Sequence, residues 1–337
     1  MHIVRIILML FLPIWIGCEG SKTNGHRSAS GITVIDAQEH TISLNKVAER
    51  IVCLYEPGLD ALYMLQAESK LVGLFSDVYE SNDLFPFYAK MDRRIEKKEL
   101  PIVGAGNQAN VESVVALNPD LVIVHAGQES LVNALRNAGL QVYAVKAELQ
   151  GEVFKTIQDI SILTGTEARG LELRQYVVAE IDRLKEGAAA VKEKRRVYFT
   201  WAYGRIFSTT GTNSMMHTCL EMAGVQNVCP FELDQPNINA ETLIGWNPDM
   251  IVMWNDSPDL FYQRHEFNTI HAVKEKQIFN LLPMFIYNPH TLKALCTATA
   301  IHHWAYFTAE FNHKQRIVEV ISRLYGKEKA DRMINLL

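Results

Sequence analysis

The 337-residue sequence lacks the features that mark several classes of protein. It has no excess of basic charge, since 33 Lys and Arg face 38 Asp and Glu, and so no global positive field gathers nucleic acid. Outside the extreme N-terminus, no apolar run approaches membrane length, which excludes a polytopic membrane protein. The 48% of hydrophobic and 21% of charged residues exclude a disordered chain or a coiled-coil rod. The length predicts about two domains.

Cysteine pairs and catalytic signatures are also missing. None of the five cysteines forms a C-x-x-C pair, which argues against a zinc ribbon or a thioredoxin-like site. Cys219 and Cys229 are compatible with a disulfide in an exported protein and equally with buried free thiols. The sequence has no G-x-S-x-G, H-E-x-x-H or P-loop, and residues 104–109 fit G-x-G-x-x-A only after a very short apolar lead-in. We therefore expect no enzyme and no resident cofactor or metal, with a Rossmann-type enzyme as the alternative.

The N-terminus is read as an export signal. Residues 1–17 combine a basic Arg5 with an apolar core of signal-peptide length. Gly17 and Cys18 follow at its end, an arrangement that resembles the bacterial lipoprotein signal and predicts lipidation at Cys18. The polar, small-residue segment 18–31 has no hydrophobic period and is typical of a flexible tether.

A pattern of polar residues occurs twice in the chain. N-x-E-x5-N-P-D followed by a four-residue apolar run begins at Asn110 and again at Asn239, an offset of 129 residues. Each Asn suits a helix N-cap, and Glu112 and Glu241 then fall in the first helical turn. The apolar run after each Asp is typical of a buried parallel strand. The pattern indicates an internal duplication.

Strand-like and helical stretches alternate around both copies. The strand-like runs RIVCLY and RRVYFTW open the two halves, and LQVYAV and KQIFNLL lie near their ends. This alternation predicts βαβ units and two similar lobes with parallel sheets, over residues 32–165 and 196–337. Between them, residues 166–195 are apolar at helical spacing, and about 25 helical residues extend ~38 Å. We expect a rigid helix spanning the two lobes.

The chain resembles the periplasmic-binding-protein family that serves iron–siderophore, haem and cobalamin ABC importers. The resemblance covers residues 31–310 and is carried by the order of ITVIDAQEHTISL, RIVCLYEPGLDALYMLQAESKLVGL, PIVGAGNQANVESVVALNPDLVIV, AGVQNV and INAETLIGWNPDMIVMWN. It implies an α/β fold of two Rossmann-like lobes joined by one long helix, with the ligand in the cleft between them. It also implies that Glu112 and Glu241 dock to arginines of the permease. The loop Tyr55-Glu56-Pro57 departs from the Ser-Pro pair of many relatives, which suggests a specialised pocket.

Candidate ligand-binding residues follow the predicted strands, because open α/β sheets bind ligands beyond the carboxyl ends of their strands. The set is aromatic with a few polar groups, which suits a large flat ligand, and Arg205 could pair with a ligand carboxylate. It comprises Tyr55, Glu56, Gln108, Trp201, Tyr203, Arg205, Trp254, Phe285 and Tyr287.

These observations favour a monomeric, lipid-anchored substrate-binding protein, exported to the periplasmic or outer side of a bacterial membrane. Its expected partners are an ABC permease and its ATPase. Its expected ligand is an iron chelate, either a siderophore or haem, or a cobalamin-like corrinoid. Capture of a bare transition-metal ion and a role as a surface adhesin or scaffold are the alternatives.

Overall fold

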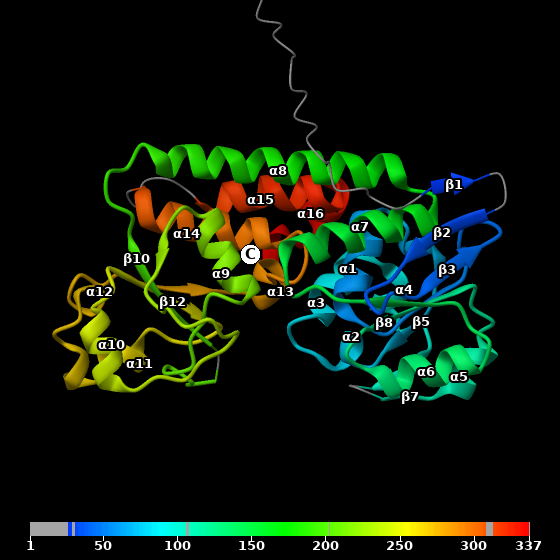
Figure 1. Cartoon of the computed structure of the whole chain (residues 1–337), viewed down its shortest axis with the longest axis horizontal. Coiled ribbons are helices and arrows are strands. Elements are labelled where there is room, and N and C mark those ends of the chain that lie inside the picture. Colours follow the sequence, from blue (N-terminus) through cyan, green and yellow to red (C-terminus); the bar gives the residue numbers. More distant parts are fainter. Residues whose placement is uncertain (1–25, 29–30, 106–107, 202, 308–312, 337) are drawn as a thin grey trace, which may run out of the picture.

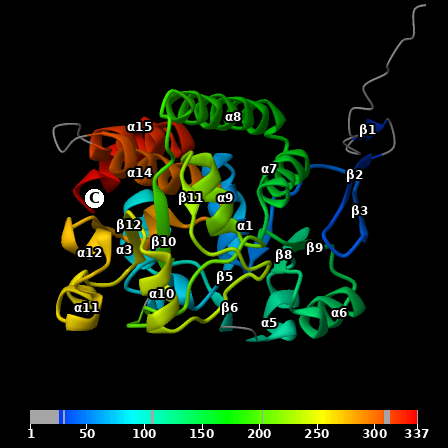
Figure 2. The ribbon, with the colours of Figure 1, turned by 60° about the vertical axis from the view of Figure 1, so that its left-hand side comes forward.

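The computed structural model describes residues 26–28, 31–105, 108–201, 203–307 and 313–336. It has two lobes side by side, and the long helix α8 (Glu167–Ala189) runs along one side of both (Figure 1). The view turned by 60° shows the same arrangement, with the lobes below α8 (Figure 2). At 1.5 Å per residue the 23 residues of α8 extend about 34 Å. This confirms the α/β fold of two lobes with parallel-rich sheets and a spanning helix.

The N-terminal lobe is built on a sheet of strand order β7-β6-β5-β4-β8-β9, parallel except for β7. The central strands are short and almost completely buried because helices cover both faces, as expected of parallel strands. A separate antiparallel sheet β1-β2-β3 precedes it. The strands are β1 (His26–Ser28), β2 (Gly31–Ile35), β3 (Thr41–Leu44), β4 (Ile51–Cys53), β5 (Leu71–Phe75), β6 (Ile102–Ala105), β7 (Gln108–Ala109), β8 (Leu121–His125) and β9 (Val142–Val145).

The C-terminal lobe has a wholly parallel sheet of order β11-β10-β12-β13. Its strands coincide with the apolar runs of the second half of the sequence, and β12 follows the second copy of the repeat directly. The strands are β10 (Arg196–Thr200), β11 (Gln226–Asn227), β12 (Met250–Trp254) and β13 (Ile278–Leu281).

Helices surround both sheets. Those of the N-terminal lobe are α1 (Glu56–Met64), α2 (Asp77–Glu80), α3 (Phe85–Met91), α4 (Arg93–Glu96), α5 (Val111–Ala116), α6 (Glu129–Asn137) and α7 (Gln150–Thr164). After α8 come α9 (Met215–Met222), α10 (Ala240–Trp246), α11 (Asp259–Tyr262), α12 (His271–Lys274), α13 (Met284–Tyr287), α14 (Ala294–Tyr306), α15 (His313–Tyr325) and α16 (Lys327–Met333). None of the helices in the described part of the chain combines the length and the apolar character needed to cross a bilayer.

The two copies of the repeat begin with the same helix cap. Asn110 accepts a hydrogen bond from the Ser113 amide at 2.9 Å at the start of α5. Asn239 accepts the equivalent bond from the Thr242 amide at 2.8 Å at the start of α10. Both caps satisfy a backbone N–H that the first helical turn leaves without a partner.

The two copies also end in the same contacts. Asp120 accepts a hydrogen bond from the Arg50 amide at 2.8 Å, and Asp249 accepts one from the Arg196 amide at 2.9 Å. Each arginine guanidinium also donates a hydrogen bond to a carbonyl oxygen at the end of the repeat helix. The N···O distance is 2.6 Å in the first lobe and 2.7 Å in the second. The duplicated segments therefore lie in equivalent surroundings and join helix to strand in the same way in both lobes.

The last helices of the chain return to the N-terminal lobe. α8 buries one face against α7, α9 and α14, while α15 and α16 pack on α1 and α3. The Arg169 guanidinium joins these parts, because it donates hydrogen bonds to the carbonyl oxygens of Met64 in α1 and of Arg323 and Leu324 in α15. The lobes are thus held together by α8 and by the C-terminal helices.

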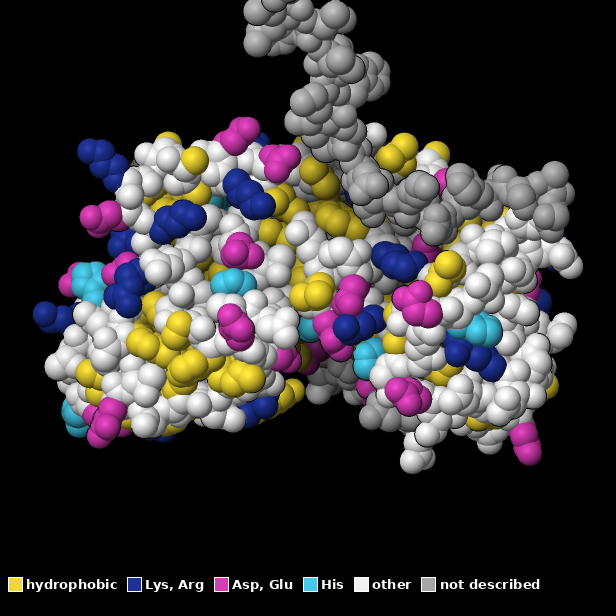
Figure 3. Space-filling view, viewed as in Figure 1, with side chains coloured by type: hydrophobic (Ala, Val, Ile, Leu, Met, Phe, Trp, Pro, Cys, Tyr) yellow, Lys and Arg dark blue, Asp and Glu magenta, His cyan; other side chains and the backbone are white. Residues whose placement is uncertain are grey.

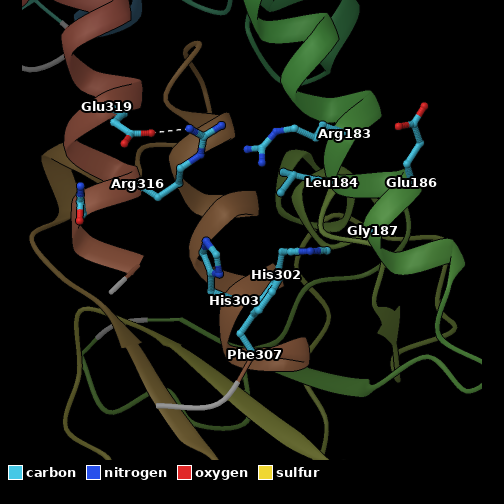
Figure 4. A pocket seen from close by; sticks show the side chains of 10 residues that line it. Arg183, Leu184, Glu186, Gly187, His302, His303, Phe307, Arg316 and Glu319 are labelled. Atoms are coloured by element: carbon cyan, nitrogen blue, oxygen red, sulfur yellow. Dashed lines mark hydrogen bonds and ion pairs between the residues drawn. The ribbon is translucent and has the colours of Figure 1, made fainter. Parts of the chain in front are cut away.

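A cavity of about 760 Å³ lies between α8, α14 and α15. Figure 4 shows Arg183 from α8 and Arg316 from α15 projecting toward it from opposite sides. Both guanidinium groups donate to the Glu180 carboxylate, at 2.6 Å and 2.5 Å. Because the guanidinium charges of Arg183 and Arg316 are both paired with the Glu180 carboxylate, we assign the cavity to helix packing and not to the candidate site.

The cysteines of the described residues are all free. Cys219 and Cys229 are both buried and are not joined, so the disulfide that the sequence left open is not formed. Burial raises the pKa of the Cys219 thiol, as expected for a cysteine that packs as a small apolar residue.

Candidate ligand-binding groove

Contacts across the lobe junction show which ends of the two sheets face it. Glu56, just after β4, accepts a hydrogen bond from Asn288 Nδ2, which follows β13 of the other lobe. The His290 ring nitrogen Nδ1 lies 2.8 Å from the carbonyl oxygen of Ala147, just after β9. Because the strands within each sheet are parallel, the carboxyl ends of β8, β10 and β12 lie on this side as well. The molecular surface is hollowed here between the lobes (Figure 3), and we call this the interlobe groove.

Each lobe places an aromatic pair at these strand ends. In the N-terminal lobe the rings of Tyr55 and His125 have centroids 4.6 Å apart. In the C-terminal lobe the indoles of Trp201 and Trp254 have centroids 6.0 Å apart, and Trp201 Nε1 donates to the carbonyl oxygen of Thr209 at 3.1 Å. All four rings are half-buried. Burial also lowers the pKa of His125, so its ring is uncharged at neutral pH.

Tyr203 and Arg205 lie in the loop that follows β10. Tyr203 is 78% exposed and has a positive φ of 65°, and Arg205 is exposed. The Gly204 amide donates to Asp256 at 2.6 Å, which joins this loop to the one after β12. The structure therefore brings both residues to the loops that carry the two tryptophans. Gln108 is exposed on β7, at the edge of its sheet, and β5 and β6 separate it from β4.

Phe285 and Tyr287 are placed elsewhere. Phe285 is only 1% exposed, stacks on Phe87 of α3 with ring centroids 4.4 Å apart, and covers the ammonium group of Lys293. Tyr287 is 6% exposed, and its carbonyl oxygen accepts a hydrogen bond from Thr297. Helix α13 turns both rings into the core, so neither is open to a ligand in this structure.

Glu56 belongs to a buried cluster of charges beneath the groove. Lys293 at the start of α14 is completely buried, with Nζ 3.1 Å from Asp60 Oδ2 and 3.7 Å from Glu56 Oε1. Asp60 is also completely buried and accepts a hydrogen bond from Tyr325 of α15. Burial, aided by the Asp60 charge, raises the pKa of Glu56 to about 7 although Lys293 and Asn288 act in the opposite direction. Two carboxyl groups thus share one ammonium group at the lobe junction.

The sequence analysis did not find Asp60, Asn288 or Lys293. One signal was present, because Lys293 is the only Lys, Arg, Asp or Glu between residues 277 and 309. A single charge in so apolar a stretch is either exposed or paired in the core. The sequence does not show whether Lys293 is exposed or paired, because the carboxylates that pair with it lie in α1, more than 200 residues earlier.

Glu112 and Glu241 occupy equivalent exposed positions. Each lies in the first turn of its repeat helix, α5 or α10, where a negative charge suits the helix dipole. Figure 1 shows these helices on the side of the molecule away from α8, one in each lobe. The two carboxylates are therefore available to a partner that spans both lobes. The predicted lipidation site, Cys18, lies outside the described residues, as does most of the predicted tether.

The described residues contain no group of three or more His, Cys, Asp or Glu side chains placed to hold a metal ion. The strand ends at the lobe junction carry aromatic rings instead, Tyr55 with His125 in one lobe and Trp201 with Trp254 in the other.

Comparison with known proteins agrees with this description. A family model described as periplasmic binding protein matches residues 51–283. An ABC transporter substrate-binding lipoprotein of Bacillus subtilis, itself uncharacterized, is 26% identical over 290 residues, which cover 82% of this chain and 88% of that protein. A cobalamin-binding protein of Halobacterium salinarum is 28% identical over 231 residues, covering 66% of this chain and 58% of that protein.

Solved structures show the same fold. A periplasmic solute-binding protein from Veillonella parvula superposes with a TM-score of 0.71 at 18% identity, covering 87% of this chain and 92% of that chain. The molybdate-binding protein of Haemophilus influenzae, solved with molybdate, gives a TM-score of 0.70 at 18% identity. The superposition covers 87% of this chain and 97% of that chain.

The chain belongs to the periplasmic binding protein family. It is a substrate-binding protein of an ABC transporter, a transport component and not an enzyme, so the Rossmann-type enzyme is set aside.

Proposed function

We propose that this protein captures a bulky metal chelate, an iron–siderophore, haem or a cobalamin-like corrinoid, in the interlobe groove. The observation that carries the proposal is the pair of half-buried aromatic sites, Tyr55 with His125 and Trp201 with Trp254, one on each side of the lobe junction. Flat or apolar ligand surfaces stack on such rings. The likeness to a cobalamin-binding protein supports a ligand of this size class.

The groove supplies polar groups as well as rings. Arg205 extends from an exposed loop beside Trp201 and offers a bidentate partner to a carboxylate of haem or of a siderophore. Tyr203, on the same loop, is 78% exposed, and in this proposal its phenol would contact the outer part of the ligand. In this account α8 and the returning C-terminal helices limit lobe movement, so binding depends mainly on side chains already in place.

Delivery requires a partner at the membrane. The proposed contact consists of Glu112 and Glu241, which would face cationic residues of the permease and set the register of docking. The proposed lipid at Cys18 and the polar segment after it would keep the protein near that permease. The membrane serves as an anchoring surface only.

The ligand proposal is tested by a thermal-shift panel of ferric siderophores, haem, cobalamin and bare transition-metal ions. A ligand at 100 times its Kd stabilises the folded state by about 2.7 kcal/mol, and we expect at least one chelate to raise the Tm by several degrees. Replacing Trp254 with alanine should reduce that shift, while replacing the half-buried Trp304, which stacks on Phe279 outside the groove, should not. A shift produced by a bare ion and by none of the chelates would contradict the proposal.

A further inference from the structure

The segment between β11 and α10 exposes large apolar side chains. Phe231 is 42% exposed and Leu233 is 57% exposed. The Phe231 ring lies against the half-buried indole of Trp246 at the end of α10, with ring centroids 6.0 Å apart. We call these three residues the α10 patch. Figure 3 shows hydrophobic side chains gathered over the part of the C-terminal lobe where Figure 1 places α10 and α11, and such a gathering is typical of a surface that binds a partner.

The backbone of this segment is fixed against the lobe. The Thr212 amide donates to the carbonyl oxygen of Phe231 at 2.8 Å, and the Asn213 amide donates to that of Leu233 at 3.3 Å. A Cβ at Gly211 would lie 2.1 Å from the Leu233 carbonyl oxygen, so the two backbones approach as closely as only glycine allows. The apolar side chains are therefore carried by a backbone already in place, and binding there requires little ordering of the segment.

Exposed carboxylates border the patch. Glu232 and Asp234 alternate with the apolar residues of the segment, and Glu241 lies in the first turn of α10. All three are exposed, and no Lys, Arg or His of the described residues forms an ion pair with them. Residues 206–263 contain seven Asp and Glu and no Lys or Arg. An apolar centre with a charged rim is the usual anatomy of a protein–protein contact, and its complement here is an apolar surface bordered by Lys and Arg.

The patch is separate from the interlobe groove. The guanidinium group of Arg196, the first residue of β10, donates to the Trp246 carbonyl oxygen at 2.7 Å. Trp246, and the Phe231 ring that packs on it, therefore lie toward the amino end of β10, whereas the groove lies at the carboxyl ends of the strands. This position favours a contact with a partner and not with the captured ligand.

The equivalent positions of the N-terminal lobe are less apolar. At the repeat offset of 129 residues, the counterparts of the patch are Ile102, Gly104 and Leu117. None of them is aromatic, and Gly104 has no side chain. Leu117 is turned into its lobe, because a Cβ at Gly73 of β5 would lie 2.5 Å from Leu117 Cδ1. The two lobes thus carry equivalent glutamates but different apolar surfaces beside them.

We propose that the α10 patch is the surface by which the C-terminal lobe docks to the permease, and that docking is asymmetric because the main apolar contact is made in this lobe. This inference rests on the docking proposed above for Glu112 and Glu241. The occupant is an apolar part of the outer surface of the permease, bordered by Lys or Arg that face Glu232, Asp234 and Glu241. The apolar centre supplies affinity, and the charged rim sets the register.

The charge of the rim argues against two other occupants. A second copy of this chain in a twofold contact would place the same carboxylates against one another. The anionic surface of a membrane would repel them as well. A cationic surface on the permease is the partner that complements both the apolar centre and its rim.

The test measures binding of the ligand-free full chain to its permease and ATPase in nanodiscs, by biolayer interferometry. Phe231→Ser with Leu233→Ser, the patch variant, should raise the Kd at least tenfold, because it removes the apolar centre and leaves the rim charges. Ile102→Ser with Val115→Ser removes two side chains of the N-terminal lobe that are 40% and 43% exposed. It should raise the Kd less than threefold.

Two further measurements show that the patch variant remains folded and binds ligand. Its urea unfolding should stay close to that of the wild type, because the replaced side chains are exposed. The thermal shifts given by the chelate panel described above should also be those of the wild type. Leu171→Ser with Val178→Ser is the matched control on α8, where the two side chains are 58% and 40% exposed, and it should leave the Kd for the permease unchanged.

Four results would overturn the inference. An unchanged Kd in the patch variant would show that the apolar centre is not a docking surface, and an equal loss in the Ile102 and Val115 variant would show that docking is symmetric. Loss of the chelate shift would make the patch part of the ligand site. A wild-type dimer that becomes a monomer in the patch variant would make it a contact between copies of this chain.

The same assay separates this inference from the docking on which it rests. Glu112→Lys with Glu241→Lys should abolish binding to the permease. Loss in that variant without loss in the patch variant would overturn the apolar contact alone. An unchanged Kd in both would contradict the proposed docking as well.

Discussion

Replacing Lys293 with methionine should lower the free energy of unfolding by about 3–5 kcal/mol, measured by urea denaturation at pH 8. The ammonium group is completely buried, lies 3.1 Å from Asp60 and sits 3.6 Å from the centroid of the Phe285 ring. Methionine fills much of the same volume, so the loss comes from the carboxylates of Asp60 and Glu56, which remain in the core without a counter-ion. Adding Asp60→Asn to the variant should restore part of the stability, because it removes one of those charges.

Lys327→Met supplies the control. That lysine is 82% exposed and pairs with Asp331 at 2.7 Å on the surface of α16, where an ion pair contributes less than about 1 kcal/mol. If Lys293→Met costs no more than Lys327→Met, the buried cluster does not hold the lobe junction together.

Reversing both exposed carboxylates, with Glu112→Lys and Glu241→Lys, should abolish uptake in cells. The proposed docking depends on one negative charge at the same position of each lobe, and like charges placed against permease cations repel. Neither residue lies at the strand ends that form the groove. The Kd for the transported chelate should therefore stay within about threefold of the wild-type value in isothermal titration calorimetry.

A matched variant with the same change in net charge is Glu172→Lys with Glu328→Lys. These residues lie on α8 and α16, on the other side of the molecule, and are 57% and 81% exposed. Uptake should survive this change. A large loss of chelate affinity in the Glu112 and Glu241 variant would instead make them ligand-binding residues.

Much of the fold could be predicted because its signals are local. An Asn cap, a Glu in the first turn and a Pro-Asp stop before an apolar run specify a short helix and the strand after it, and the second copy at Asn239 repeats the same pattern. The long helix α8 ends at Ala189, earlier than the predicted 195, because residues 190–195 lead into β10 through an exposed turn.

The site was only partly predictable, because strand ends indicate a region and not the direction of a side chain. That reasoning selected Tyr55, Trp201 and Trp254, and the structure places Tyr55 beside His125 and Trp201 beside Trp254; their role in ligand binding stays a prediction. It also selected Phe285 and Tyr287, whose short helix α13 turns them into the core. The charged cluster depends on contacts between α1, α14 and α15, which no local pattern encodes.

The central claim is that one ligand is held by both lobes at once, and calorimetric titration tests it most directly. With the chelate that gives the largest thermal shift, Tyr55→Ala in one lobe and Trp254→Ala in the other should each raise the Kd at least tenfold, or about 1.4 kcal/mol. Trp304→Ala should leave it unchanged. Affinity that survives both groove variants, or that responds to only one lobe, would contradict the account.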